Sequence, residues 1–339
     1  PPPSPPSPPP APPEPPLPPS PPVPPPFSPS PPAPPPLKPG GLTGDPHLHF
    51  AHGGEADFRG EDGAIYAMLH HAGLAVNALF EAVAFMLEHG GLKVRGTFVT
   101  DVFIRINTAL TQRALRIEFT PNAPPTPLVH GLGSSARRVI AGETPLVVED
   151  VTVSVLSRGI SRSVFGVATT EEVLQVLTAD WAINATSRLI WQSTMPGKKQ
   201  VDLMFVPLRD PLAPNLKTGK VVSPHGLVGQ SFDGDNIAVF GNKDHYRELW
   251  WRQSSFKGKE ITTEAQAEGA IEGAGDDYKV ADFFSTDFKY RRFGIAEAAP
   301  RNISTLSGAK RIGHQGSTWS TSRAGTLGDD MAGIYRRRK

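Results

Sequence analysis

The feature that most constrains the fold of this chain is the proline-rich segment at its start. Twenty-six of the first 40 residues are proline, whereas the other 299 residues contain only 12. Proline fixes φ at about −65°, lacks a backbone N–H donor and pushes the preceding residue towards extended geometry. Such a segment cannot pair into a helix or a sheet, so we expect a polyproline II rod over residues 1–40.

The residues that interrupt the prolines often recur at a spacing of three, which is the repeat of the polyproline II helix. Each such run places its variable side chains along one edge of the rod. The apolar members of this edge are predicted assembly contacts: Leu17, Val23 and Phe27. At about 3.1 Å per residue the rod would be about 110 Å long, about twice the width of a head of this size. A semi-rigid spacer or an unstructured tail is the alternative.

The tripeptide Ser-Pro-Pro occurs repeatedly in the rod. This repeat resembles the hydroxyproline-rich glycoproteins of plant and green-algal cell walls, such as extensins and pherophorins. The resemblance implies hydroxylated prolines that carry short arabinose or galactose chains. The predicted glycosylation sites of the rod are Ser4, Pro5, Pro6, Ser7, Pro8, Pro9, Pro21, Pro22, Pro31 and Pro32. Ligands of SH3 and WW domains share this composition, but they usually carry a basic residue beside the core, and the rod has only Lys38.

The composition of the whole chain restricts its partners and its chemistry. The net charge of +1 creates no global attraction for nucleic acid or anionic membranes, and no apolar run is long enough for a membrane-spanning helix. The absence of cysteine excludes disulfides, thiolate catalysis and thiolate zinc sites. That absence is commoner inside cells, whereas a chain that starts at Pro1 suggests a removed export signal. Asn184 and Asn302 begin N-glycosylation sequons, which agree with export.

Beyond the rod we predict a mainly β, antiparallel head over residues 41–295 and a Ser/Gly-rich basic extension over residues 296–339. Gly40 and Gly41 are interpreted as a hinge between rod and head. Alternating or β-branched runs bounded by turn residues predict strands. These runs cover residues 102–108, 114–120, 145–158, 172–187 and 201–210.

Two motifs in the head resemble von Willebrand factor type D domains. The first is GDPH at residues 44–47, and the second is HGLVGQSFDGD at residues 225–235. The second also resembles the end of a related module in inter-alpha-trypsin inhibitor heavy chains. The resemblance implies a strand over residues 74–89, although that segment is rich in helix formers. Two cysteine positions of the family are His225 and Val228 here, so its disulfides are absent.

The resemblance also bears on metal binding. An acidic residue that contributes to the calcium site of the family is His52 here. Asp233, Asp235 and Asn236 still offer three oxygen side chains in a glycine-containing loop, which suits Ca2+. The same residues also form ordinary turns. We therefore expect no required cofactor, with Ca2+ as a candidate ligand of this loop.

Three histidines near the first motif suggest a zinc site. His47 and His49 would share one face of a strand, and His52 follows closely. No further ligand can be assigned downstream, so we favour histidines that are hydrogen-bonded within an opening strand.

In some proteins that carry GDPH, the Asp-Pro bond breaks autocatalytically and the freed aspartyl group links to another molecule. The resemblance makes Asp45, Pro46 and His47 candidate residues for autocleavage. The Asp45 carboxyl would attack its own carbonyl carbon, and His47 would supply a proton to the departing Pro46 nitrogen. The sequence alone favours the simpler interpretation that GDPH only builds a turn. The chain has no nucleophile elbow and no phosphate-binding loop, so we do not expect an enzyme.

These features predict a secreted structural glycoprotein of a cell wall, extracellular matrix or flagellar surface. Rods that dock on neighbouring heads would build an open filament, with candidate groove residues Trp250, Trp251, Trp319 and Tyr246. The expected partners are copies of the chain and extracellular glycans or wall glycoproteins, with no nucleic acid and no membrane span. The basic end, RRRK at residues 336–339, suits an acidic glycan. The alternatives are a glycan-binding adhesin with the rod as a stalk, and an autoprocessing cross-linker.

Overall fold

The structure is a computed structural model of the chain. It describes residues 38–87, 91–124, 126–133, 135–162, 166–214, 219–235, 237–244, 246, 259–298 and 310–312. All of these lie in one compact unit, Leu37–Lys339. Residues 1–37 of the predicted rod lie outside the described residues, together with its glycosylation sites and assembly contacts, and Gly40, its last predicted residue, begins a strand of the head. Also outside the described residues are Asn236, Trp250, Trp251, Asn302 and Trp319.

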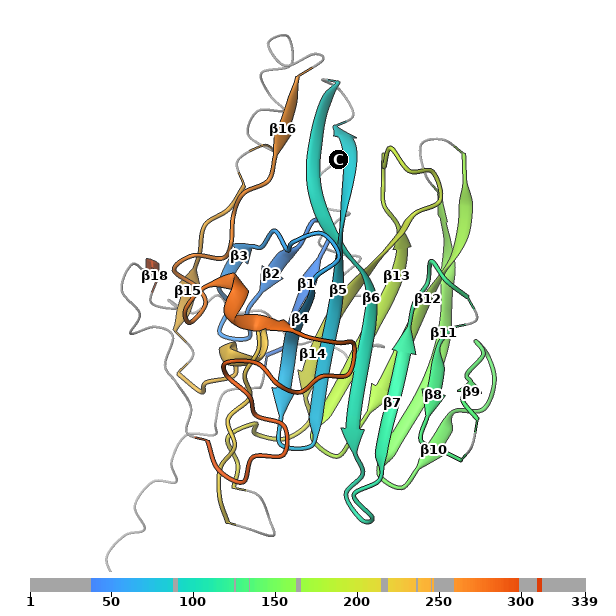
Figure 1. The fold of residues 1–339 in the computed structure, drawn as a ribbon, viewed down its shortest axis with the longest axis vertical. Helices are drawn as coiled ribbons and strands as arrows, with labels where there is room; N and C mark the ends of the chain where they lie inside the picture. Colours follow the sequence, from blue (N-terminus) through green and yellow to red (C-terminus); the bar gives the residue numbers. More distant parts are fainter. Residues whose placement is uncertain are drawn as a thin grey trace, which may run out of the picture. The chain divides into compact units, whose positions relative to one another are not determined.

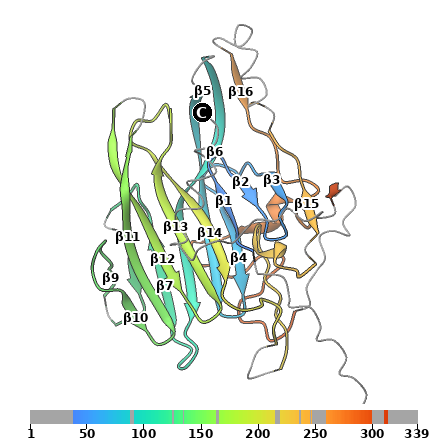
Figure 2. The same cartoon turned by 180° about the vertical axis from the view of Figure 1, so that it is seen from behind.

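Two eight-stranded sheets form the head (Figure 1). The first, sheet I, has the strand order β10-β11-β12-β13-β14-β1-β2-β3 and is antiparallel throughout. Its strands are β1 (Gly40–Thr43), β2 (His47–His49), β3 (Glu55–Asp57), β10 (Leu146–Val148), β11 (Val151–Arg162), β12 (Ala168–Leu177), β13 (Trp181–Leu189) and β14 (Lys199–Pro207). Figure 2 shows this sheet from behind.

The second sheet, sheet II, has the order β17-β4-β5-β6-β7-β8-β9. Its members are β4 (Ile65–His71), β5 (Leu74–Leu87), β6 (Leu92–Asn107), β7 (Ala114–Phe119), β8 (Leu128–His130), β9 (Arg137–Arg138) and β17 (Lys279–Val280). The eighth strand, β16 (Glu260–Thr262), pairs in parallel with β6. The mainly β, antiparallel fold expected from the sequence is therefore confirmed, and the five runs predicted as strands lie in β6, β7 and β10 to β14.

The core lies between the two sheets because successive residues of a strand point to opposite faces. Alternate positions are fully or almost fully buried, and the positions between them face outwards. The inward side chains include Leu42, Leu48, Leu203 and Phe205 of sheet I, and Val76, Ile104, Ile117 and Phe119 of sheet II. Burial of each such side chain stabilises the fold by about 1.5–3 kcal/mol.

The segment rich in helix formers is a strand, as predicted. β5 pairs with β4 on one side and with β6 on the other, and both of its faces are buried over Leu74–Ala78. A strand buried on both faces needs a continuous apolar run rather than an alternating one. This explains a composition that helix propensity alone misreads.

The end of β5 and the start of β6 project beyond the rest of the sheet as a ribbon, and β16 pairs with β6 there (Figure 1). A second, smaller apolar cluster stabilises this ribbon. Its members are Val83, Phe85, Leu92, Val94, Phe98, Ile190 and Tyr246. Tyr246, which we expected to line a surface groove, is only 4% exposed, so that prediction is wrong.

Gly40 and Gly41 are not a hinge. Both are buried in β1, which lies between β14 and β2. A Cβ atom on Gly41 would lie 2.2 Å from the Leu203 carbonyl oxygen, so the close approach of two strands requires glycine here.

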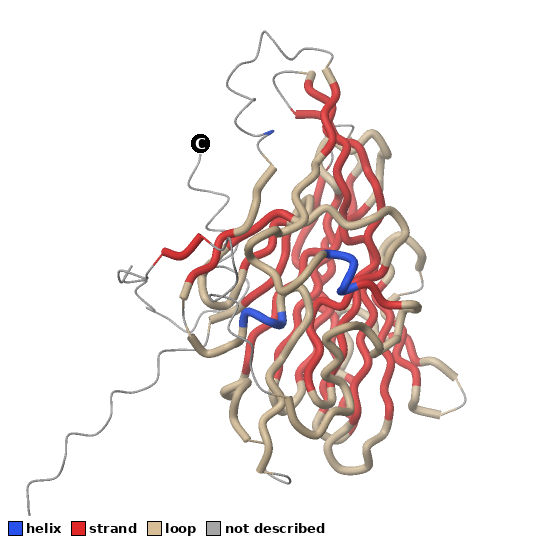
Figure 3. The backbone as a smooth tube through the Cα atoms, turned by 60° about the vertical axis from the view of Figure 1, so that its left-hand side comes forward, coloured by secondary structure: helices blue, strands red, loops and turns tan. Residues whose placement is uncertain are grey.

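The chain after β14 contacts β3 at the edge of sheet I and β4 near the edge of sheet II, and its described part contains only short elements (Figure 3). Besides β16 and β17, these are the 3-10 turns η1 (Gly229–Ser231) and η3 (Gly275–Tyr278) and the antiparallel pair β15 (Ala238–Phe240) and β18 (Lys310–Ile312). The pairing of β18 joins part of the predicted C-terminal extension to the head. Within the described part of the chain, no helix is long and apolar enough to cross a membrane.

Candidate functional site

The GDPH motif forms the turn between β1 and β2. Gly44 has φ +68°, a conformation that favours glycine. Its N–H donates to Oδ1 of Asp202 on β14 over 3.1 Å. The Pro46 carbonyl accepts a hydrogen bond from the Phe58 N–H over 2.9 Å. The backbone is therefore anchored on both sides of the Asp45–Pro46 bond.

His47 lies between two carboxylates. Its Nδ1 is 2.6 Å from Oδ1 of Asp57, the residue directly opposite on β3, and its Nε2 is 3.1 Å from Oδ1 of Asp45. The Tyr246 hydroxyl donates to the other carboxylate oxygen of Asp45, Oδ2. We call Asp45, His47, Asp57 and Tyr246 the aspartate–histidine cluster.

The cluster is largely shielded from water, which strengthens its electrostatic interactions. The Asp45, His47 and Asp57 side chains are 8%, 17% and 6% exposed. Burial alone would lower the pKa of His47, but the hydrogen bonds to Asp45 and Asp57 outweigh it and raise this pKa to about 9. At neutral pH, His47 is therefore an imidazolium that donates from both nitrogens.

Neighbouring strands hold the carboxylates of the site in place. Asp57 Oδ2 accepts the N–H of Asp244 over 2.8 Å. Asp202, which holds Gly44, forms an ion pair with Arg188 at 3.2 Å. Burial raises the pKa of Asp202, and Arg188 opposes that effect. These contacts make Asp202 a positioning residue for the turn.

Sequence reasoning missed most of the partners of His47. The short β2–β3 hairpin could have indicated Asp57, because its register places residue 57 opposite residue 47. Tyr246 and Asp202 lie 201 and 158 residues away from their partners in the motif, and no local pattern predicts those contacts.

We expect the head to lose stability at alkaline pH through His47. Its pKa is about 9 in the folded state and about 6.5 when unfolded, so the contribution is complete below pH 6.5 and lost as pH rises through 9. A difference of this size corresponds to about 3 kcal/mol. Urea unfolding of the wild type at pH 6.5 and 9.5 would measure it.

The variants His47→Gln and Asp57→Asn should show a smaller loss over the same interval. An equal loss in the wild type and both variants would contradict the ionised state of His47.

The second motif forms an additional pairing at the edge of β4, beyond β17. His225 and His70 exchange both backbone hydrogen bonds, at 2.6 and 2.9 Å, and the Leu227 N–H donates to the Ala67 carbonyl. Gly226 has φ +118°, and a Cβ there would lie 2.6 Å from the Met68 carbonyl oxygen. The first glycine of HGLVGQ, Gly226, is therefore required by its close contact with β4.

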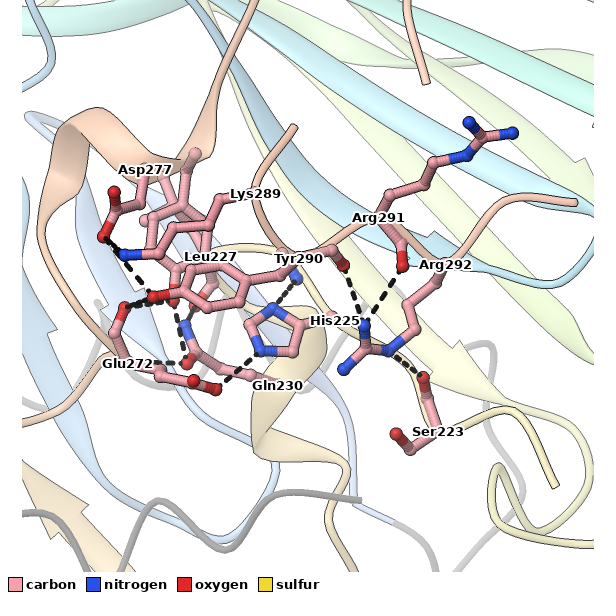
Figure 4. A network of polar contacts seen from close by, with 12 residues as sticks. Ser223, His225, Leu227, Gln230, Glu272, Asp277, Lys289, Tyr290, Arg291 and Arg292 are labelled. Atoms are coloured by element: carbon pink, nitrogen blue, oxygen red, sulfur yellow. Dashed lines mark hydrogen bonds and ion pairs between the residues drawn. The ribbon is translucent and has the colours of Figure 1, made fainter. Parts of the chain in front are cut away.

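A polar network surrounds His225 (Figure 4). His225 Nδ1 accepts the Gly226 N–H over 2.9 Å, so its proton is on Nε2, 3.2 Å from Oε2 of Glu272. Its ring stacks on Tyr290, with centroids 4.5 Å apart. Gln230 Oε1 accepts hydrogen bonds from the Glu272 N–H and the Tyr278 hydroxyl.

This network joins the 225–230 loop to the segment that contains η3. The network includes His225, one of the two positions at which the resemblance to von Willebrand type D domains implies cysteine. Non-covalent contacts thus hold this region, and we assign the network a structural role.

The predicted calcium loop forms a turn. Asp233 Oδ1 accepts the Asp235 N–H, and Asp235 Oδ1 accepts the Ile237 N–H. Asp235 Oδ2 and His52 Nε2 are both buried without a hydrogen-bond partner. Burial lowers the pKa of His52 to about 4, against the opposing charge of Asp235. Calcium binding at Asp233 and Asp235 stays a prediction.

The described residues contain no group of three or more side chains arranged to hold a metal ion. His47 and His49 do share a face of β2, as predicted, but their partners are carboxylates. His49 Nδ1 is 3.6 Å from Glu55. The first histidines of the head are therefore engaged within the opening strands.

Of the two predicted N-glycosylation sites, Asn184 is described. It lies in the middle of β13, is 9% exposed and accepts a hydrogen bond from Gln175. A glycan on Asn184 would therefore have to displace Gln175 and the other neighbouring side chains that bury this asparagine.

Comparison with known proteins assigns no family. No protein-family model matches the chain, and no curated protein matches it significantly. The resemblance to von Willebrand type D domains stays a prediction that rests on the two motifs.

Proposed function

We propose that the head breaks its own Asp45–Pro46 peptide bond, as part of an extracellular structural glycoprotein. The observation that supports this function is the aspartate–histidine cluster. In this cluster the Asp45 carboxylate and the protonated His47 imidazole flank one Asp-Pro bond, and their side chains are mostly buried from water. A simple turn would need neither the buried Asp57 nor the buried Tyr246.

The chemistry requires only residues of the cluster. A carboxylate oxygen of Asp45 attacks the main-chain carbonyl carbon of the same residue and closes a five-membered ring. The C–N bond to Pro46 breaks, and the proline nitrogen takes a proton from His47, which becomes neutral. The products are a C-terminal aspartyl anhydride and a free N-terminal proline. Water, an amine or a hydroxyl group then opens the anhydride.

Each other member of the cluster has a distinct part in this reaction. Asp57 keeps His47 protonated at neutral pH, because its hydrogen bond raises the pKa of the imidazole. Tyr246 restricts the rotation of the Asp45 carboxylate through its hydrogen bond to Oδ2. Asp57 and Tyr246 therefore act as positioning residues.

Breakage of the bond would leave the two fragments associated. β1 precedes Asp45 and is paired with β14 on one side and with β2 on the other. The N-terminal fragment would thus keep a buried central strand of sheet I. Cleavage must therefore be measured under denaturing conditions.

The expected result is a fragment that ends at Asp45 and a second that begins at Pro46, detected by intact mass after denaturation. The chain provides its own control, since Asp210–Pro211 is a second Asp-Pro bond outside the cluster, and Asp210 Oδ1 accepts the Leu212 N–H. Asp45→Ala should abolish the cleavage, and Asp57→Asn should shift its pH profile to lower pH.

Two outcomes would overturn the proposal. One is an intact chain after long incubation between pH 5 and 8. The other is equal cleavage at Asp45–Pro46 and Asp210–Pro211, which would indicate ordinary acid hydrolysis.

In the wider proposal, the N-terminal fragment carries the polyproline rod and the reactive end. Its anhydride would attach the rod to a hydroxyl or amino group of a matrix glycan or glycoprotein. Filament assembly and hydroxyproline glycosylation of the rod remain predictions.

A further inference from the structure

A row of positive charge crosses the outer face of sheet II. Arg105 on β6 lies directly opposite Arg116 on β7, and Arg116 lies directly opposite His130 on β8. Arg138 on β9 extends the same face, opposite Leu128. Like charges directly opposite each other destabilise a sheet. The Arg105–Arg116 pairing therefore adds charge repulsion to the sheet.

Arg291 lies beside this row. Its Nε donates to the Phe293 carbonyl, and the Arg105 guanidinium lies 5.1 Å from the centre of the Phe293 ring. We call Arg105, Arg116, Arg138 and Arg291 the basic strip. Arg116, Arg138 and Arg291 are exposed, and Arg105 is partly buried.

The charge of the basic strip is not neutralised by neighbouring carboxylates. Among the residues that the structure describes, none of the four arginines forms an ion pair with Asp or Glu. The nearest carboxylate on the same face of β7 is that of Glu118, two residues after Arg116. Its Oε1 lies 3.1 Å from His130 Nε2. The remaining partners of the strip are aromatic rings and backbone carbonyls.

Aromatic rings pack around the basic strip. The Arg116 guanidinium lies 5.5 Å from the centre of the Phe284 ring. Phe103 stacks on Phe283 with centroids 4.2 Å apart, and the Phe283 side chain is 46% exposed. The rings restrict the guanidinium groups without consuming their outward N–H donors. They also leave one apolar ring exposed beside the cations.

We propose that the basic strip binds an anionic polysaccharide that carries sulfate or carboxylate groups. Guanidinium forks match the geometry of both anions. Strands lie about 4.8 Å apart, so an extended anionic chain that crosses the strands would meet arginines on β6, β7 and β9. The exposed Phe283 ring offers an apolar surface for a sugar face.

A polysaccharide fits this surface better than a nucleic acid does. Nucleic-acid affinity comes mainly from the number of phosphates that a protein neutralises, and it falls steeply as salt rises. The strip has four arginines, and the chain has a net charge of only +1. The proposal is independent of Asp45–Pro46 cleavage, because the strip lies on sheet II and the aspartate–histidine cluster lies on sheet I.

The test measures binding of the full chain to heparin, polygalacturonate, neutral dextran and RNA at about 150 mM salt. We expect binding to heparin, polygalacturonate or both, and none to dextran. The preferred polymer identifies the anion as sulfate or carboxylate. The triple variant Arg116→Gln, Arg138→Gln and Arg291→Gln should bind about tenfold more weakly or worse.

A matched triple variant controls for net charge. Lys93→Gln, Arg209→Gln and Lys220→Gln remove three exposed cations that are paired with Glu260, Asp180 and Glu297 elsewhere on the head. This control should keep its affinity within about threefold and should melt like the strip variant. Equal affinity of the two triple variants would overturn the proposal. The proposal would also be overturned if the chain bound dextran with the same affinity as the anionic polymers, or if it bound RNA more tightly than either anionic polysaccharide.

Discussion

Replacement of Gly54 by alanine is expected to destabilise the head by about 3 kcal/mol or more, a large part of the roughly 5–15 kcal/mol that stabilises a typical native protein. Gly54 precedes β3 and lies against β15. A Cβ atom there would lie 1.8 Å from the Val239 carbonyl oxygen and 2.6 Å from its carbonyl carbon. Both atoms belong to the backbone, so no side-chain rotation can relieve the clash.

The effect should be specific to this packing. Gly133→Ala provides the control, because a Cβ at that position meets no atom within 4 Å. That change should leave the free energy of unfolding almost unchanged, or raise it slightly through the loss of unfolded-state entropy. Urea unfolding and soluble yield measure both variants. Similar stability of Gly54→Ala and Gly133→Ala would mean that β15 does not lie against residue 54.

The strands of the core were predictable because their signal is local. Alternating runs such as those of β7 and β14 have one buried and one outward face, and that period can be read directly from the sequence. β5 was harder, since burial on both faces removes the alternation and leaves a composition that also suits a helix. Its neighbours β4 and β6 decide its structure, and they become visible only in the sheet.

The candidate site was only partly predictable for a related reason. GDPH indicated Asp45, Pro46 and His47, which are adjacent in the chain. Asp57 and Tyr246 give the motif its charge and its shielding, but they reach it through sheet pairing and tertiary packing. Conversely, a Gly-Gly pair resembles a flexible joint in sequence, whereas in β1 the missing side chains permit close strand packing.

Acidification from pH 6.5 to 4 is expected to remove about 5 kcal/mol of stability through two buried histidines, as much as the whole stability of a marginally stable domain. These two are His70 and His52; burial also lowers the pKa of His71, which adds to the loss. Burial lowers the pKa of His70 to about 4, against the hydrogen bond that it makes with Asn77, and burial also lowers the pKa of His52 to about 4. Each difference from the unfolded value of about 6.5 corresponds to about 3 kcal/mol.

The direction follows from the linkage between folding and proton binding. Below pH 6.5 the unfolded chain binds protons at both histidines, whereas the folded chain stays neutral there until pH 4. Stability must therefore fall through this interval and level off below it. His47 does not offset the loss, because its folded-state pKa of about 9 keeps it protonated in both states at acidic pH.

Two substitutions separate the histidines from other acid effects. His70→Gln keeps a donor for Asn77 Oδ1, and His52→Asn keeps an acceptor for the Gly54 N–H, but neither replacement titrates. Each should reduce the loss measured by urea unfolding at pH 6.5 and 4 by about 2–3 kcal/mol. The hydrogen bond from His49 lowers the pKa of Glu55 to about 2, so this carboxylate titrates mainly below the tested interval. An undiminished loss in the double variant His52→Asn, His70→Gln would therefore show that groups other than these two histidines cause acid unfolding.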